Sequence, residues 1–170
     1  TVVLKPDEKT PLSTLYLGAL IREAGFPDGV VNIVPGIGET AGAAIASHPG
    51  IDKVAFTGST ETGRSVVRAA AGNLKRVSLE LGGKSPFVVF PDADLDEAMD
   101  AAARYAFFLQ GQNCQCASRI FVHENIFERF CAGLVARAES MIVGPGWEAD
   151  TRIGPLISAE HRERVAGYVA

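Results

Sequence analysis

The chain has 170 residues and a formal net charge of −4, and 47% of its residues are hydrophobic. This length and composition support a buried core in one domain or in parts of two. Charges of both signs are interspersed, which argues against a basic face for nucleic acid or an anionic membrane. No apolar run approaches the roughly 20 residues of a membrane-spanning helix.

Strand and helix patterns alternate through the first half of the chain. The predicted strands are 2–5, 30–34, 53–56 and 76–79, the first of them buried. Between them we expect a helix that Thr10 caps, Pro11 begins and Gly25 ends, a small-residue helix over 40–47, and a helix that opens at 57–60 and runs to about 71.

This alternation predicts an α/β fold with one parallel sheet covered by helices. Ligands of such sheets collect beyond the carboxyl ends of the strands. Four segments lie at or just after predicted strand ends, namely Lys5, 35–36, 58–59 and Glu80. We therefore expect these segments to converge on one crevice.

The second half begins after a glycine pair and repeats the alternation. We expect a strand over 87–90, a helix from 92 to about 108 capped by Asp92 or Asp94, a strand over 120–123, and a helix from 126 to about 141. The boundary between two domains is placed near 81–84, which divides the chain into 1–81 and 82–170. The first residues read as a strand entered midway and the last as an interrupted helix, so the chain is expected to be part of a longer protein.

The numbers and spacing of the cysteines and histidines limit which disulfides and metal sites the chain can form. The three cysteines are an odd number without a regular framework, which favours a reducing, cytoplasmic location over a secreted disulfide scaffold. The three histidines are scattered without metal-ligand spacing, so no metal site is predicted.

Cys114 is the candidate nucleophile. It follows Gly111, Gln112 and Asn113 between a predicted helix and a predicted strand. Only the thiolate attacks carbonyls, and backbone N–H groups of a turn can hold the resulting oxyanion. A buried structural cysteine is the commoner alternative in general, and it remains our interpretation of Cys116 and Cys131.

Glu80 is the candidate general base, because a carboxylate in a partly apolar crevice can accept a proton from water. Its neighbours Leu79 and Leu81 and the glycines at 82–83 weaken the alternative of a solvated glutamate at a strand end. The paired glycines let another segment or a ligand approach the backbone closely.

Two further segments suggest nucleotide binding. Residues 56–63 pass from strand to helix, and free N–H groups at a helix start bind phosphate oxygens. The usual G-x-G-x-x-G pattern is absent, so an ordinary capped helix is the alternative. Lys5 and Glu8 follow the first strand, where an acidic group accepts hydrogen bonds from ribose hydroxyls and repels a 2′-phosphate. A solvated charged loop is the alternative there.

Together these segments resemble the middle third of the NAD(P)-dependent aldehyde dehydrogenases, and the resemblance extends over the whole chain. Its most specific motif is Leu79-Glu80-Leu81-Gly82-Gly83-Lys84-Ser85-Pro86. The remaining segments that carry it are 5–11, 25–36, 56–59, 111–114 and 153–157. The separation of Glu80 from Cys114 is also similar to the family's.

The resemblance implies a Rossmann-like part of a cofactor domain in 1–81 and the start of an α/β catalytic domain in 82–170. It implies that Cys114 is the nucleophile and Glu80 the base. The cofactor would be NAD, with NADP possible, and its implied binding residues are Lys5, Glu8, Gly36, Gly58, Ser59, Leu81 and Gly82. The implied substrate residues are Phe108 and Asn113, and the implied substrate is a small-molecule aldehyde.

The resemblance also implies what the 170 residues lack. An oxyanion-binding asparagine would precede residue 1, and a glutamate that holds the nicotinamide ribose would follow residue 170, together with the strands of a homodimer or homotetramer. We therefore expect the isolated chain to be inactive or nearly so. Gln115 and Cys116 depart from the family's usual small or apolar residues, which leaves the substrate open.

Three other functions are weighed against NAD-dependent aldehyde oxidation. A CoA-acylating relative is disfavoured because some of those enzymes lack the glutamate that Glu80 represents. A cysteine hydrolase without a cofactor needs a partner histidine, and none lies in a comparable motif. A non-catalytic relative is disfavoured because both Cys114 and Glu80 are present.

Overall fold

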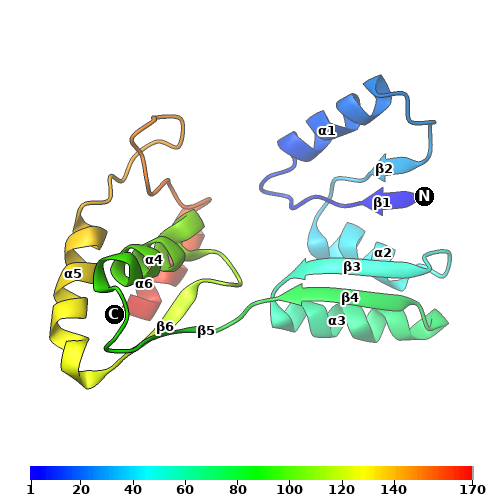
Figure 1. The fold of residues 1–170 in the computed structure, drawn as a ribbon. Helices are drawn as coiled ribbons and strands as arrows, with labels where there is room; N and C mark the ends of the chain where they lie inside the picture. The colour runs from blue at the N-terminus through cyan, green and yellow to red at the C-terminus, as the bar shows by residue number, and fades with distance from the viewer. Residues whose placement is uncertain (170) are drawn as a thin grey trace. The chain divides into compact units, whose positions relative to one another are not determined.

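The computed structural model describes residues 1–169 and divides into two compact units, Thr1–Leu81 and Gly82–Ala170 (Figure 1). Both units combine helices with parallel strands, so the predicted α/β class is confirmed. The assignment of the first unit to a cofactor domain and of the second to a catalytic domain stays a prediction.

The first unit alternates strands with helices. Its elements are β1 (Val2–Leu4), α1 (Leu12–Glu23), β2 (Val31–Ile33), a π-helical turn η1 (Gly38–Gly42), α2 (Ala43–Ser47), β3 (Lys53–Gly58), α3 (Thr60–Ala70), a 3-10 turn η2 (Ala71–Asn73) and β4 (Arg76–Leu81). In Figure 1, α1 lies beside the β1–β2 pair and contacts β2, and α3 lies beside the β3–β4 pair and contacts both strands.

The prediction of one sheet for this unit is wrong. β1 pairs with β2 and β3 pairs with β4, both in parallel, as two separate two-stranded sheets in the described chain. One helix connects the strands of each pair. The segment between β2 and β3 instead carries two short helical pieces, η1 and α2, and no ladder of hydrogen bonds joins the two pairs.

The expectation of a buried first strand is also wrong. Val2 and Val3 are 52% and 40% exposed. β1 has one partner strand in the described chain, and α1 packs against β2. The two valines therefore keep about half of their side-chain surface uncovered within this unit.

The start of α1 differs from the prediction. Pro11 occupies the N-cap position without a side-chain hydrogen bond, and Thr10 does not cap the helix. The Thr10 N–H instead donates to the Asp7 carbonyl at 3.3 Å, because residues 7–10 close a turn of their own. The end agrees with the prediction: Gly25, at φ 83°, donates to the Arg22 carbonyl and terminates the helix.

β3 and β4 both continue further than the sequence indicates. Their register pairs Thr57 with Glu80 and Gly58 with Leu81, so these residues lie within strands and not after them. Ser59 then caps α3. Parallel pairing in register extends the ladder to the last residue before the cap, which local patterns could not indicate.

A buried lysine connects the segment before β4 to the end of α2. Lys75 precedes β4 and is 7% exposed. Its Nζ donates to the carbonyls of Ala46 and His48 at 2.8 and 2.7 Å, and these carbonyls belong to the C-terminal end of α2. The charge is therefore held by main-chain oxygens that the short helix leaves unsatisfied.

The second unit follows the predicted order with shifted ends. Its elements are β5 (Ser85–Val89), α4 (Leu95–Phe107), a 3-10 turn η3 (Phe108–Gly111), β6 (Ala117–Val122), a 3-10 turn η4 (Glu124–Ile126), α5 (Phe127–Glu139) and α6 (Ala159–Val169). β5 and β6 pair in parallel. Asp94, one of the two predicted caps, accepts the N–H groups of Asp96 and Glu97 at 3.0 and 3.1 Å.

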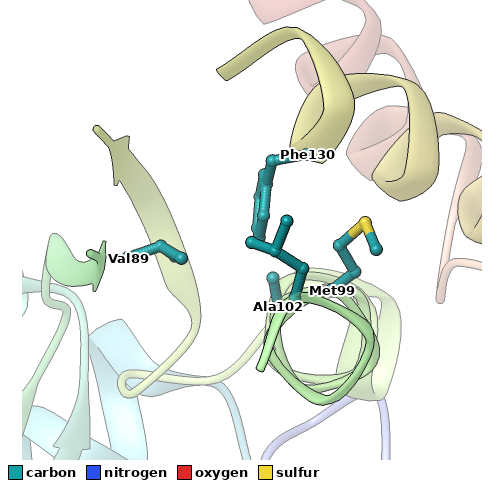
Figure 2. Close-up of a cluster of buried hydrophobic side chains, with 5 residues drawn as sticks. Val89, Met99, Ala102 and Phe130 are labelled. Atoms are coloured by element: carbon teal, nitrogen blue, oxygen red, sulfur yellow. The ribbon is translucent and has the colours of Figure 1, made fainter. Parts of the chain in front are cut away.

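A continuous apolar core holds this unit together. It consists of Val89, Leu95, Met99, Ala102 and Phe130. Figure 2 shows the Phe130 ring, on α5, reaching toward Ala102 on α4, with Val89 on the strand side. Phe130 is 1% exposed, so the core lies between the helix pair and the parallel strands.

Candidate active site

The Cys114 thiol is exposed on a tight turn between η3 and β6. The Cys116 N–H donates to the Asn113 carbonyl at 3.0 Å and closes the turn. The Gln115 N–H donates to the Asn113 side-chain oxygen, Oδ1, at 2.8 Å. Two of the three N–H groups that follow Asn113 are therefore taken by Asn113 itself.

The third N–H, that of Cys114, has no acceptor within residues 1–169. It belongs to the residue that bears the thiol. A free backbone donor beside a nucleophile is the arrangement that stabilises an oxyanion formed by attack of that nucleophile. Of the three N–H groups that follow Asn113, the Cys114 N–H is therefore the one left free to bind an oxyanion.

The segment that leads into this turn is conformationally strained. Leu109 and Gln110 have φ of 51° and 56°, and Gly111 has φ of 72°. Left-handed conformations cost non-glycine residues of order 1–3 kcal/mol and cluster at functional sites. Cys116 and Ala117, directly after the turn, are 8% and 6% exposed, so the turn is anchored to the interior on that side. The burial agrees with the structural interpretation of Cys116.

The glycine pair of the glutamate motif meets the cysteine turn. A Cβ on Gly83 would lie 2.7 Å from the Cys114 carbonyl oxygen, a separation that only glycine allows. The Ser85 hydroxyl donates to the same oxygen at 3.4 Å. A Cβ on Gly82 would meet nothing within 4 Å. The close approach that the sequence predicted for the glycine pair is thus made at Gly83, against the main chain of the nucleophile's turn.

Glu80 lies in β4 with an exposed side chain. Leu79 and Leu81 point to the opposite face, where both lie within 4 Å of the position that a Cβ on Gly63 of α3 would take. The two leucines therefore do not surround the Glu80 carboxylate, because successive side chains of a strand alternate between its faces. Glu80 belongs to the first unit and Cys114 to the second, so their pairing stays a prediction.

Lys5 and Glu8 form an ion pair after β1, with Nζ and Oε2 3.0 Å apart. The hydrogen bond from Lys5, followed by the Glu8 backbone N–H and a smaller contribution from the Gly38 backbone, holds the pKa of Glu8 below its ordinary value. The carbons of the Lys5 side chain lie 3.6–3.9 Å from the position of a Cβ on Gly42 in η1. The pair is thus placed against η1, and its lowered pKa keeps the Glu8 carboxylate ionised at neutral pH.

Gly36 follows β2 in a tight environment. A Cβ there would lie 2.7 Å from the Cβ of Ala41, so the main chain approaches η1 more closely than a side chain would permit. The role of Gly36 toward the cofactor stays a prediction.

The start of α3 presents free backbone donors. The Ser59 hydroxyl accepts the Thr62 N–H at 3.1 Å and donates to the Thr62 hydroxyl at 2.9 Å. The N–H groups of Thr60 and Glu61 have no acceptor in the described chain. The sequence indicated free N–H groups at this helix start, and the structure shows that they belong to Thr60 and Glu61, directly after the Ser59 cap.

Phe108 lines a cleft of the second unit with a volume of about 440 Å³, between α4, α5 and the segment at 152–153. The residues that line it are Asp100, Ala103, Arg104, Phe107, Phe108, Arg137, Ser140, Met141, Arg152 and Ile153. Asn113 is not among them, and its side-chain oxygen is bound within the turn. The substrate roles of Phe108 and Asn113 stay predictions.

No helix within residues 1–169 is long and apolar enough to cross a membrane. Over the same residues, no three His, Cys, Asp or Glu side chains are grouped so that they could hold a metal ion.

The chain is similar in sequence and in structure to known proteins. The model of the aldehyde dehydrogenase family matches residues 1–170. Retinal dehydrogenase 2 of Mus musculus is 60% identical over 97% of the chain and 32% of its own length, and aldehyde dehydrogenase 1A1 of Bos taurus is 56% identical over 99% and 34%. The NAD⁺ complex of a Bacillus cereus aldehyde dehydrogenase is 52% identical with a TM-score of 0.97, over 99% of the chain and 34% of that structure.

The chain therefore spans about a third of the length of these relatives. It belongs to the aldehyde dehydrogenase family.

Proposed function

We propose that the protein that carries this chain oxidises an aldehyde to a carboxylic acid with NAD, through covalent catalysis by Cys114. The observation that carries the proposal is the cysteine turn itself. Its thiol is exposed, and the adjacent Cys114 N–H is the one backbone donor of the turn that Asn113 leaves free.

The described residues of the first unit fit the proposed cofactor. The ionised Glu8 carboxylate, paired with Lys5, suits the hydroxyls of a ribose. The free N–H groups of Thr60 and Glu61, beside Gly58 and Ser59, suit the oxygens of a pyrophosphate. NAD, when bound, supplies the acceptor for the hydride that leaves the substrate carbon. Glu8 favours NAD over NADP because its negative charge repels a 2′-phosphate.

Gly36, Leu81 and Gly82 complete the proposed cofactor set. Gly36 lies against Ala41 at the start of the helical segment that also contacts Lys5, and the open space at Gly82 leaves room for a ligand beside the backbone. Leu81 ends β4 next to Glu80, so any group bound there would lie near the proposed base.

The chain's own residues account for the covalent steps. The Cys114 thiolate adds to the aldehyde carbon, and the Cys114 N–H stabilises the oxyanion of the thiohemiacetal. Loss of hydride from that carbon leaves a thioester on the sulfur. Glu80 then takes a proton from water, the resulting hydroxide attacks the thioester, and the carboxylic acid leaves with regeneration of the thiolate.

The proposal is tested in the full-length protein with an aldehyde, following NADH with and without CoA. Cys114→Ser should abolish turnover, because a serine hydroxyl is a far weaker nucleophile at neutral pH. Glu80→Gln should give one burst of NADH and then slow by about 100-fold, because the thioester persists without its base. Cys131→Ser, on α5, is the matched cysteine control.

Two results would contradict the proposal. Full turnover by Cys114→Ser would show that Cys114 is not the nucleophile. Unchanged steady-state turnover by Glu80→Gln would show that Glu80 is not the base. NADH formation that depends on CoA would show that the protein is a CoA-acylating enzyme instead.

A further inference from the structure

The two strained residues that lead into the cysteine turn differ in what their side chains contact. Leu109 and Gln110 have left-handed backbone angles, φ 51° and 56°, which non-glycine residues keep only where surrounding contacts impose them. The Leu109 side chain is 56% exposed, whereas Gln110 is half-buried. Of the two, Gln110 is therefore the side chain placed to hold this backbone.

The two ends of the Gln110 amide bind two different segments. Its oxygen accepts the Gly154 N–H at 2.8 Å, and its nitrogen donates to the Leu109 carbonyl at 2.9 Å. This orientation of the amide is the one that gives both ends a partner. A Cβ on Gly154 would lie 2.8 Å from the Gln110 amide, so the contact depends on glycine at that position.

The other neighbours of the Gln110 amide are apolar. Gln110 and Gly154 line a cleft of about 340 Å³ with residues such as Phe107, Val143 and Leu156. Among the described residues that line it, Gln110 is the one with a hydrogen-bonding side chain. An amide in such surroundings costs free energy unless both ends are hydrogen-bonded, whereas methionine would pack there without that requirement. The glutamine therefore indicates a need for the two hydrogen bonds.

The segment that carries Gly154 is itself fixed to the core of the second unit. The Ile153 carbonyl accepts the Gly144 N–H at 3.1 Å, and the Ile153 N–H donates to the Ile142 carbonyl at 3.1 Å, shortly after α5. Because α5 is packed through Phe130, the Gln110 amide connects the strained segment to the best-packed part of the chain.

Hydrogen bonds continue from Gln110 toward the nucleophile. The Leu109 carbonyl that binds the Gln110 amide also accepts the Gln112 N–H at 3.1 Å and the Gln112 side-chain amide at 3.2 Å. Gln112 directly precedes Asn113, which closes the turn around Cys114. Burial fixes the chain after the turn, and these hydrogen bonds fix the chain before it.

We infer that Gln110 is a positioning residue that ties the strained entry of the cysteine turn to Gly154, so that segment 153–157 takes part in placing the Cys114 sulfur and N–H. The importance of this placement for catalysis rests on the proposed function. The inference gives a role to segment 153–157, which the proposed mechanism leaves without one.

A purely structural role for Gln110 makes a different prediction. Loss of its two hydrogen bonds would then lower the melting temperature of the protein. At temperatures well below melting, however, the first turnover would keep its rate, because the position of Cys114 would not depend on the Gln110 amide.

The test measures the rate of NADH formation in the first turnover of the full-length protein, well below its melting temperature. Gln110→Met keeps the length of the side chain and loses both hydrogen bonds. It should slow the first turnover about tenfold, the size expected for two lost hydrogen bonds, and leave the KM for NAD unchanged. Gln112→Met loses only the 3.2 Å bond to the same carbonyl and should slow it by less than about threefold.

Gly154→Ala disturbs the same contact from the other side. The added methyl group would displace the Gln110 amide, while the Gly154 backbone has no positive φ that alanine would strain. We expect a slowing similar to that of Gln110→Ala. The double variant should be no slower than Gln110→Ala alone, because the amide is then already absent. If the Gln110 variants do not fold, as judged by circular dichroism, slowing by Gly154→Ala carries the test.

A second measurement needs neither aldehyde nor cofactor. Hydrogen exchange over 109–116 should accelerate in Gln110→Met and in Gly154→Ala, whereas exchange over β3 and β4 should not change. The inference is overturned if Gln110→Met keeps both its first-turnover rate and its exchange, or if the effects of Gln110→Ala and Gly154→Ala add in the double variant.

These outcomes are separable from those of the proposed function. A protein without dehydrogenase turnover, but with accelerated exchange over 109–116 in both single variants, would refute the function and keep the role of Gln110. An active enzyme whose first turnover does not respond to Gln110→Met would refute only the role of Gln110.

Discussion

The two units are stabilised by different kinds of interaction. In the first unit the buried apolar side chains within the described chain are small, namely Ala46, Val54 and Ala70, and the buried charge of Lys75 lies among them. In the second unit a large ring, Phe130, centres a continuous core between two helices and two strands.

This difference also separates the two proposed catalytic groups. Cys114 stands on a turn closed by hydrogen bonds, and it is followed by the buried Cys116 and Ala117. Glu80 stands on the exposed face of a two-stranded sheet, opposite the side that packs against α3. The nucleophile is therefore positioned by contacts of its own unit, whereas contacts within the first unit do not enclose the base.

The largest effect is expected from Phe130→Ala. Removal of a fully buried ring leaves a cavity between α4 and α5 and should lower the free energy of unfolding by about 3–5 kcal/mol. Hydrogen exchange in the full-length protein should accelerate at β5 and β6 and not at β3 and β4. Phe127→Ala, at a position 47% exposed on the same helix, should have a much smaller effect. Equal acceleration in both units would show that they do not differ as proposed.

Lys75→Met should have an intermediate effect, now in the first unit. It removes both hydrogen bonds of the Lys75 Nζ, to the carbonyls of Ala46 and His48, and should destabilise by about 2 kcal/mol, although the His48 carbonyl keeps the Ile51 N–H as a donor. Exchange should accelerate at α2 and β4. Lys53→Met, at an exposed position of β3, removes the same charge without a buried partner and is the control. If the two variants behave alike, the buried hydrogen bonds of Lys75 do not stabilise the unit.

The smallest effect is expected from the Lys5–Glu8 pair, because it is exposed and screened by salt. The pKa of Glu8 is lowered in the folded chain, so the stabilisation is present above the ordinary value of 4.5 and is lost as the pH falls through the folded value. Glu8→Gln should therefore melt slightly lower than the unmodified protein at pH 7 and at the same temperature at acidic pH. A difference that persists at acidic pH would mean that charge is not its cause.

Short-range features were predictable from the sequence. The cap at Asp94, the helix end at Gly25 and the helix start after Ser59 depend on side chains and dihedral angles within a few residues. The cysteine turn was also indicated by its own letters, because Gly111 and Asn113 are residues that turns favour.

Long-range arrangements were not predictable in this way. The split into two strand pairs, the inclusion of Glu80 in β4 and the burial of Lys75 depend on which segments meet, and no local pattern records that. The packing partner likewise decides which face of a strand is covered: α3 packs on the face of Leu79 and Leu81, so Glu80 is left on the exposed face.

The sequence by itself determined the α/β class, the family's motifs and the identity of the candidate nucleophile, because composition, periodicity and motif letters are properties of neighbouring residues. Only the tertiary structure decided that Gly83 lies against the Cys114 carbonyl and that Asn113 leaves the Cys114 N–H free. The physical reason is that close approach and hydrogen-bond saturation depend on the positions of atoms that folding brings together.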